Sequence, residues 1–179
     1  MSAVALRHGC AMVFLLIAGC GGRAHTSIPL TSSQMALFDH GIDWIATPSA
    51  LEGQWKVEWY NELEQRIRYA DVVAVCVVRT LRTDADHEQD TAYRMTVELG
   101  NVLKGDAGSG EVELTVSKQD AGFAVVESNR NRILGGAFVV FLRKTSASTK
   151  DHRASFHLLT ASPEVIDIVQ SRIAANDNT

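Results

Sequence analysis

The apolar positions of the chain predict two helices on either side of a run of strands. Between Ala50 and Ala70 the apolar residues follow the 3.6-residue period of one helix face; they are Trp55, Trp59, Leu63, Ile67 and Ala70. Ser49 and Glu52 have the spacing of a capping box at its start. The second helix is expected after Ser162, because Pro163 suits a first helical position. Its apolar stripe is Val165, Ile168, Val169 and Ile173.

Between these helices the apolar residues alternate with a period of two, which is typical of strands. The segments with this pattern are Val72–Leu81, Tyr93–Leu99, Val112–Val116, Ala137–Arg143 and Ala154–Thr160, and Phe123–Glu127 is a candidate short strand. Gly100 interrupts one of them and predicts a β-bulge. We expect five strand residues in particular to be buried: Val75, Val97, Leu114, Val140 and Phe156.

No helical pattern separates one predicted strand from the next, so parallel crossover connections are not expected and the sheet should be mainly antiparallel. Five or six short antiparallel strands remove their exposed edges by closing into a barrel. The sequence therefore predicts a mainly β (α+β) domain over residues 49–175. We expect a small antiparallel OB-like barrel of five or six strands with a flanking helix at each end.

The N-terminus has the layout of an export signal. Arg7 precedes the apolar run Cys10–Ala18, which is too short to cross a hydrocarbon core about 30 Å thick. The run ends in Leu16–Cys20 (LIAGC), which resembles the lipobox of bacterial lipoproteins. The resemblance implies a signal peptide over residues 1–19 that is cleaved between Gly19 and Cys20. It also implies acyl chains such as palmitate on Cys20, with residues 20–48 as the lipidated N-terminus and tether.

Lipid attachment would place the protein in the cell envelope. Gly21 follows the cysteine, and by the same resemblance a residue other than Asp there implies the periplasmic face of the outer membrane. The mature chain would keep one other cysteine, Cys76, in the run Val72–Val78. A thiol in such a strand is expected to be a buried apolar group with a raised pKa, not a nucleophile.

Several short motifs of the strand region together resemble a known class of domain. They are Arg68–Val73 (RYADVV), the strand with Tyr93 and Val97 that ends in Val102–Gly105 (VLKG), Val112–Val116 and Gly136–Leu142 (GAFVVFL). This order is similar to the OB-like barrel of netrin-type and tissue-inhibitor-of-metalloproteinase-like domains, over about Ala70–Thr160. The resemblance implies the fold only, because the chain lacks the disulfide cysteines of such domains and its N-terminal cysteine would be acylated.

The composition excludes some functions and leaves few sites for chemistry. The 179 residues carry a net charge of −4 at pH 7, which argues against nucleic-acid binding. No metal-ligand spacing occurs among the five histidines of the mature chain, which are His25, His40, His87, His152 and His157. The acidic stretch Asp84–Asp90 lacks the Gly and Glu of a calcium loop and is interpreted as a solvated hairpin tip. No nucleophile motif or phosphate-binding loop is found, so we predict no catalytic residue, metal or cofactor.

Two hypotheses of different class follow. The first is a lipid-anchored, non-catalytic interaction domain of the cell envelope, with an envelope protein or glycan as partner. Its candidate surface is a patch of arginines converging on one side of the barrel: Arg79, Arg82, Arg94, Arg130 and Arg132. The second is an exported hydrolase with a site assembled from dispersed groups such as His87, His157, Glu111 and Glu113.

Overall fold

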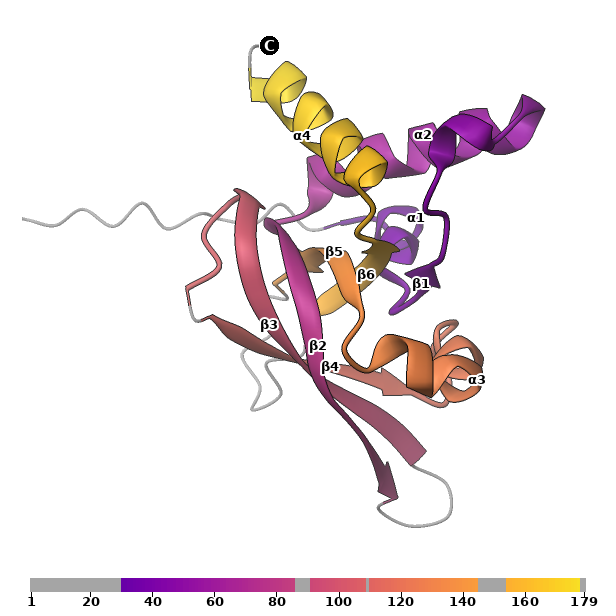
Figure 1. Cartoon of the computed structure of the whole chain (residues 1–179), viewed down its shortest axis with the longest axis vertical. Helices are drawn as coiled ribbons and strands as arrows, with labels where there is room; N and C mark the ends of the chain where they lie inside the picture. Colours follow the sequence, from indigo (N-terminus) through magenta and orange to yellow (C-terminus); the bar gives the residue numbers. More distant parts are fainter. Residues whose placement is uncertain (1–29, 86–90, 109, 145–153, 178–179) are drawn as a thin grey trace, which may run out of the picture.

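The computed structural model describes residues 30–85, 91–108, 110–144 and 154–177 as six strands and four helices (Figure 1). The strands are β1 (Ile42–Asp43), β2 (Val72–Ala85), β3 (Thr91–Lys104), β4 (Glu111–Ser117), β5 (Ala137–Arg143) and β6 (Ser155–Thr160). The helices are α1 (Ser32–Met35), α2 (Gly53–Tyr69), α3 (Phe123–Ile133) and α4 (Pro163–Asp177). Two 3₁₀ turns, η1 (Ala36–Phe38) and η2 (Pro48–Ala50), flank β1.

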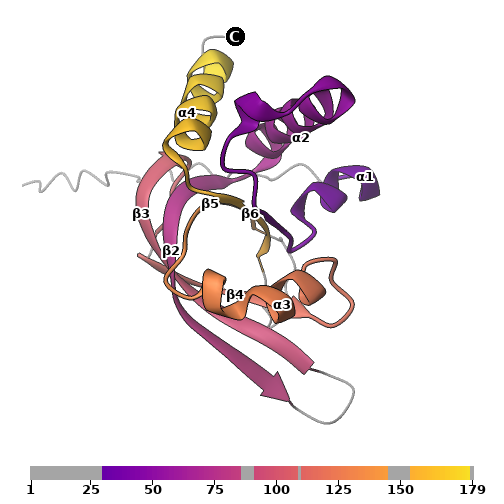
Figure 2. The ribbon, with the colours of Figure 1, turned by 45° about the vertical axis from the view of Figure 1, so that its right-hand side comes forward.

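The six strands form one mixed sheet in the order β1-β6-β5-β2-β3-β4. All pairings are antiparallel except β1 with β6, which are parallel. The α+β class, mainly β and mainly antiparallel, is therefore as expected. The closed barrel is not: the sheet is curved but open between its edge strands, β1 and β4 (Figure 2).

The reason for the open sheet lies in the segment that follows β4. Instead of pairing with the far edge, the chain turns at Asp120–Gly122 and enters α3. This turn meets the loop before β1, where a methyl group on Gly122 would overlap the carbonyl oxygen of His40. Nδ1 of His40 lies 2.9 Å from Oδ2 of Asp120, and the His40 ring stacks on Phe156. Side chains and a helix therefore occupy the place where a barrel would have a row of backbone hydrogen bonds.

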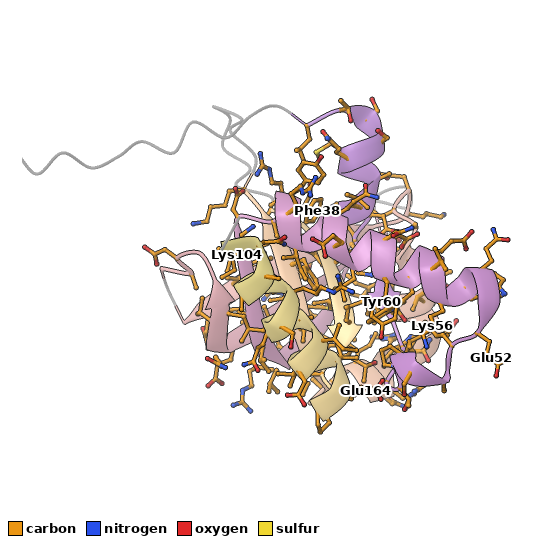
Figure 3. The ribbon with its side chains drawn as sticks, turned by 90° about the horizontal axis from the view of Figure 1, so that it is seen from above. Phe38, Glu52, Lys56, Tyr60, Lys104 and Glu164 are labelled. Carbon is orange, nitrogen blue, oxygen red and sulfur yellow. The ribbon has the colours of Figure 1, made fainter. Side chains whose placement is uncertain are left out.

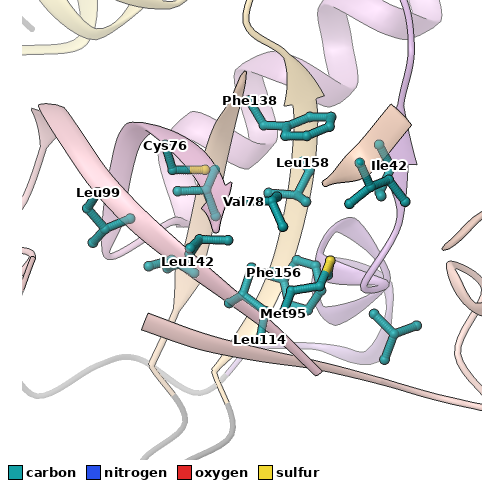
Figure 4. Packing of buried hydrophobic residues seen from close by; sticks show 14 of the residues in the cluster. Ile42, Cys76, Val78, Met95, Leu99, Leu114, Phe138, Leu142, Phe156 and Leu158 are labelled. Carbon is teal, nitrogen blue, oxygen red and sulfur yellow. The ribbon is translucent and has the colours of Figure 1, made fainter. Parts of the chain in front are cut away.

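Each face of the sheet buries its own core. The inner face carries residues such as Cys76, Met95, Leu114, Phe138 and Phe156 (Figure 4). They cluster with Val126 and Ile133 of α3. The outer face carries Val73, Val139, Phe141 and Leu159 beneath Leu63 and Ile67 of α2 and Val165 and Val169 of α4. Because side chains of a strand alternate between faces, a sheet covered on both sides needs strands that are apolar throughout, as β5 and β6 are.

The helices at both ends of the sheet are confirmed, and α2 differs from the prediction at its start. Trp59, Leu63, Ile67 and Ala70 are buried, but Trp55 is 76% exposed. The first turns of α2 extend beyond α4 and the sheet, toward Glu52 in Figure 3, and none of the described residues covers Trp55 there. The capping box is also absent, because Ser49 lies in η2 and donates its backbone N–H to Glu164.

The end of α2 is tied to the sheet by two cationic side chains. Nζ of Lys104 on β3 donates to the carbonyl oxygens of Ile67 and Arg68, and Arg143 on β5 donates to that of Tyr69. Cations at a helix C-terminus are stabilised by the helix dipole and satisfy its last carbonyl groups. Lys104 marks this end of α2 in Figure 3.

The strand predictions hold with three changes. The predicted short strand Phe123–Glu127 is wrong, because these residues begin helix α3. Strands β2 and β3 are longer than expected and reach Ala85 and Thr91. Of the five residues expected in the core, four are buried and Val75 is half-buried. The β2–β3 register shifts opposite Gly100, as expected. Residues Ile42–Asp43, within the segment interpreted as tether, pair with β6.

Candidate functional site

A hollow formed by described residues lies beside α3. It has a volume of about 550 Å³ and is lined by Leu81 of β2, the helical run Glu127–Arg132, and Leu134. We call it the α3 groove. Its lining combines guanidinium, amide and hydroxyl groups with two leucines, of which Leu134 is 53% exposed. Binding sites for polar ligands use such convergent donors beside a small apolar surface.

The shape of α3 follows from its sequence. Val126 and Ile133, seven residues apart, anchor the helix in the inner core. Between them Asn129 leaves helical geometry (φ −120°, ψ 19°), and its amide nitrogen donates to the carbonyl oxygen of Val125, 2.8 Å away. A side chain that bonds the preceding turn competes with the helical ladder. The helix is therefore kinked at the centre of the groove.

Arg130 and Arg132 are held in the groove by aromatic rings. The guanidinium of Arg130 lies 5.4 Å from the ring centre of Tyr93 and donates to Oγ1 of Thr83 at 3.2 Å. That of Arg132 lies 4.4 Å from the ring centre of Trp44 and donates to Oδ1 of Asn129 at 3.4 Å. Such cation–π contacts hold a guanidinium in place without neutralising its charge. Each group has five N–H donors, most of which these contacts leave unused.

The five arginines expected to form one patch are in fact divided between two surfaces. Arg79, Arg82 and Arg94 lie on the outward side of the β2–β3 hairpin, and each is paired with a carboxylate. Their partners are Glu98 for Arg79, Glu113 for Arg82, and both Asp84 and Glu113 for Arg94. On this surface the charge of each of the three arginines is therefore balanced by a neighbouring carboxylate. The hypothesis of a single convergent patch is therefore wrong, and only Arg130 and Arg132 share a hollow.

The ion pairs single out the arginines of the groove. Nine arginines lie in the described ranges, and six of them form ion pairs there: Arg66, Arg79, Arg82, Arg94, Arg143 and Arg172. Within those ranges Arg68, Arg130 and Arg132 have no carboxylate partner, and the last two line the α3 groove. The polar run Ser128–Arg132 (SNRNR) was the available sequence signal for this site, but only the structure shows which arginines lack acids.

A second polar cluster lies under η1 on the outer face of the sheet. Nδ1 of His157 on β6 is 2.9 Å from Oδ1 of Asp39, which also accepts the backbone N–H of Gly41 at 3.0 Å. Arg66 on α2 lies close by and donates through Nε to the carbonyl oxygen of Leu37. His157 is 6% exposed, and its Nε2 is buried without a hydrogen-bond partner in the described structure.

The charge states of this cluster follow from burial. Burial lowers the pKa of His157, the hydrogen bond that its ring donates to Asp39 opposes this, and the positive charge of Arg66 lowers the pKa further. Burial alone would raise the pKa of Asp39, but the hydrogen bond with His157 and its other contacts bring the pKa below its ordinary value. His157 is therefore neutral near pH 7, and its Nδ1–H donates to the Asp39 carboxylate.

Among the described residues, the remaining candidates do not come together in one site. Burial raises the pKa of the Cys76 thiol to about 12, as expected for an apolar strand position. Glu113 pairs with Arg82 and Arg94 on the outward surface of the sheet. The structure shows no cluster of three or more potential metal ligands in the parts it describes. Gly19, Cys20, His25, His87 and His152 lie outside the described residues.

No helix in the described part of the chain is long and apolar enough to cross a membrane. In comparisons with known proteins, no family model and no curated protein matches the chain.

Proposed function

We propose that the protein is a lipid-anchored, non-catalytic interaction domain of the cell envelope, tethered through Cys20 at the periplasmic face of the outer membrane. The observation that carries the binding role is the α3 groove, which presents two oriented arginines without carboxylate partners in the described structure. The anchoring role rests on the sequence Leu16–Cys20 at the end of the apolar run. Two or three acyl chains give stable membrane attachment, whereas one chain gives marginal attachment.

We also infer that the domain is an OB-like barrel opened at one seam. Five strands are ordered β6-β5-β2-β3-β4, and α3 connects β4 to β5. OB-folds are partly open five-stranded Greek-key barrels that bind oligosaccharides and oligonucleotides. This order is what we would expect if the resemblance to netrin-type and tissue-inhibitor-of-metalloproteinase-like domains is genuine. A net charge of −4 favours a protein or glycan partner over nucleic acid.

Radiolabelled palmitate tests the anchor. In a bacterial host that acylates lipoproteins, the full chain should incorporate the label, and Cys20→Ala should not. Cys76→Ala is the matched control and should be labelled like the wild type, because Cys76 is buried in β2. Equal labelling of the wild type and Cys20→Ala would refute lipid attachment at this residue.

In-cell photo-crosslinking tests the binding role. A photoreactive residue at Asn131, which is exposed in the groove, should capture an envelope component. The same residue at Gln65, exposed on α2, should not capture that component. A Cys20→Ala background should reduce capture, because tethering raises the local concentration at the membrane. Identical products from both positions would contradict a binding role for the groove.

The alternative function, an exported hydrolase, is favoured by one observation, the Asp39–His157 pair. A carboxylate bonded to Nδ1 orients an imidazole so that Nε2 can act as a base. Within the described structure, however, no hydroxyl or thiol bonds to Nε2, and this atom is buried. Turnover of a chromogenic acetyl ester that disappears in His157→Gln, with folding unchanged, would favour the hydrolase over the binding domain.

A further inference from the structure

We propose that the α3 groove binds an anionic glycan, and that the guanidinium groups of Arg130 and Arg132 each hold a carboxylate or phosphate group of the sugar. The inference rests on the proposed binding function and specifies the chemistry of its partner. Its volume of about 550 Å³ lies in the range of small-molecule sites and fits a few sugar units.

The charges of the groove favour a negatively charged ligand. Arg130 and Arg132 contribute two positive charges, and Glu127 contributes one negative charge. Neither arginine has a carboxylate partner among the residues that the structure describes. A planar guanidinium pairs with carboxylate or phosphate through two parallel hydrogen bonds, which makes arginine the preferred residue for such groups.

The orientation of the arginines also indicates that they are prepared for a ligand. Tyr93 and Trp44 each cover one face of a guanidinium, so the N–H donors at its edge stay available. A long side chain that is already ordered loses less conformational entropy on binding. Near the C-terminus of α3 these cations also complement the helix dipole. Complementing the helix dipole needs only a positive charge, so a lysine at either position would serve that role equally well.

The other groups of the groove indicate a sugar instead of a bare ion. Ser128, Asn129 and Asn131 supply hydroxyl and amide groups that can donate to and accept from sugar hydroxyls. Leu81 and the exposed Leu134 supply an apolar surface for the carbon face of a ring. An inorganic anion would use the arginines and leave the exposed side chains of Ser128 and Asn131 to water.

Calorimetric titration of the purified full chain with tetragalacturonate tests the proposal, with maltotetraose as the neutral probe and inorganic phosphate as the free anion. We expect binding of tetragalacturonate, weakened by salt, and no measurable binding of maltotetraose. Phosphate should bind more weakly than the acidic sugar. Binding of maltotetraose as tight as that of tetragalacturonate, or of phosphate as tight as the sugar, would overturn the proposal.

Variants that each remove one positive charge at a different position locate the site. Arg130→Gln and Arg132→Gln should each weaken tetragalacturonate binding about tenfold or more. Arg68→Gln removes the same charge from an exposed arginine on α2 that also lacks a described carboxylate partner, and should leave binding within about twofold. Arg132→Lys should bind more weakly than the wild type, because lysine keeps the charge but not the planar pair of donors. Equal weakening by Arg68→Gln would show a general charge effect and overturn the site.

A variant that is expected to bind more tightly separates the loss of a ligand contact from the loss of folding, because a misfolded protein would not gain affinity. Glu127→Gln removes the one carboxylate of the groove and should tighten tetragalacturonate binding. Unchanged or weaker binding in a folded Glu127→Gln protein would contradict the proposed placement of the anion. If the crosslinked partner is lost in Arg130→Gln while no acidic sugar binds the wild type, the glycan proposal fails and the interaction function stands. If substitutions in the groove change neither capture of the partner nor binding of the sugar, both the glycan proposal and the interaction function of the groove fail.

Discussion

The contact between Asp39 and His157 should be the most costly polar interaction to remove. It joins residues 118 positions apart and holds the loop after η1 against β6. Asp39→Ala removes the acceptor of His157 Nδ1–H, which is buried and has no other described partner, and the acceptor of the Gly41 amide. A lost charge-assisted hydrogen bond that leaves a buried donor unpaired costs about 1.5–3 kcal/mol, and the partly buried amide adds about 1 kcal/mol. We therefore expect a loss of about 2.5–4 kcal/mol.

Urea unfolding of the purified chain, followed by tryptophan fluorescence, measures this loss. With a slope of about 2 kcal/mol per molar urea, the midpoint should fall by about 1–2 M at constant slope. Asp106→Ala is the matched control, because Oδ1 of Asp106 accepts the amide of Gly108 two residues on, at 2.9 Å, in an exposed turn. It should lose less than about 1 kcal/mol. A loss in Asp39→Ala no larger than in Asp106→Ala would refute the reasoning.

Three further predictions concern stability. Burial lowers the pKa of His157 in the folded chain, so the unfolded chain takes up this proton first as the pH falls below 6.5. The free energy of unfolding should therefore decrease below this pH. In urea titrations at several pH values, His157→Gln should make this decrease smaller. Leu63→Ala should lose about 2–5 kcal/mol in the same assay, because Leu63 is 1% exposed, whereas the exposed Trp55→Ala should change it by less than about 0.5 kcal/mol. Gly122→Ala should lower the thermal midpoint by at least several degrees, because its methyl group would overlap the carbonyl oxygen of His40; an unchanged midpoint would contradict this close packing.

The sequence predicted the elements with long, regular patterns. The alternation in Tyr93–Leu99 and Val112–Val116 and the 3.6-residue stripe of α4 reflect one buried face each, and their positions are correct. Helix α3 was missed because only two of its residues, Val126 and Ile133, reach full burial, and the polar run between them hides the period. Strand β1 has only two residues, too few for any pattern.

The open sheet and the groove depend on contacts between distant residues. Whether β4 meets the far edge is decided by the turn at Gly122 against His40, which no local pattern encodes. The five arginines were expected on one surface, since alternation alone does not show which of them face a carboxylate. The separation of Arg130 and Arg132 from the paired arginines follows from cross-strand pairs such as Arg79 with Glu98.

The pairing of β1 with β6 has a mechanical consequence if the chain is tethered through Cys20. A load on the tether would first reach residues 32–43, which join the sheet through the Asp39–His157 contact and two parallel residue pairs, Ile42 with Leu158 and Asp43 with Leu159. The 14-residue strands β2 and β3 resist with a much longer ladder. The first event under force would be detachment of this N-terminal segment, which would lengthen the tether by about 40 Å. His40, which contacts Asp120 just before α3, lies in the detached segment, and Trp44, which covers Arg132, is the residue that follows it. Detachment would therefore also loosen the α3 groove and weaken its hold on a partner.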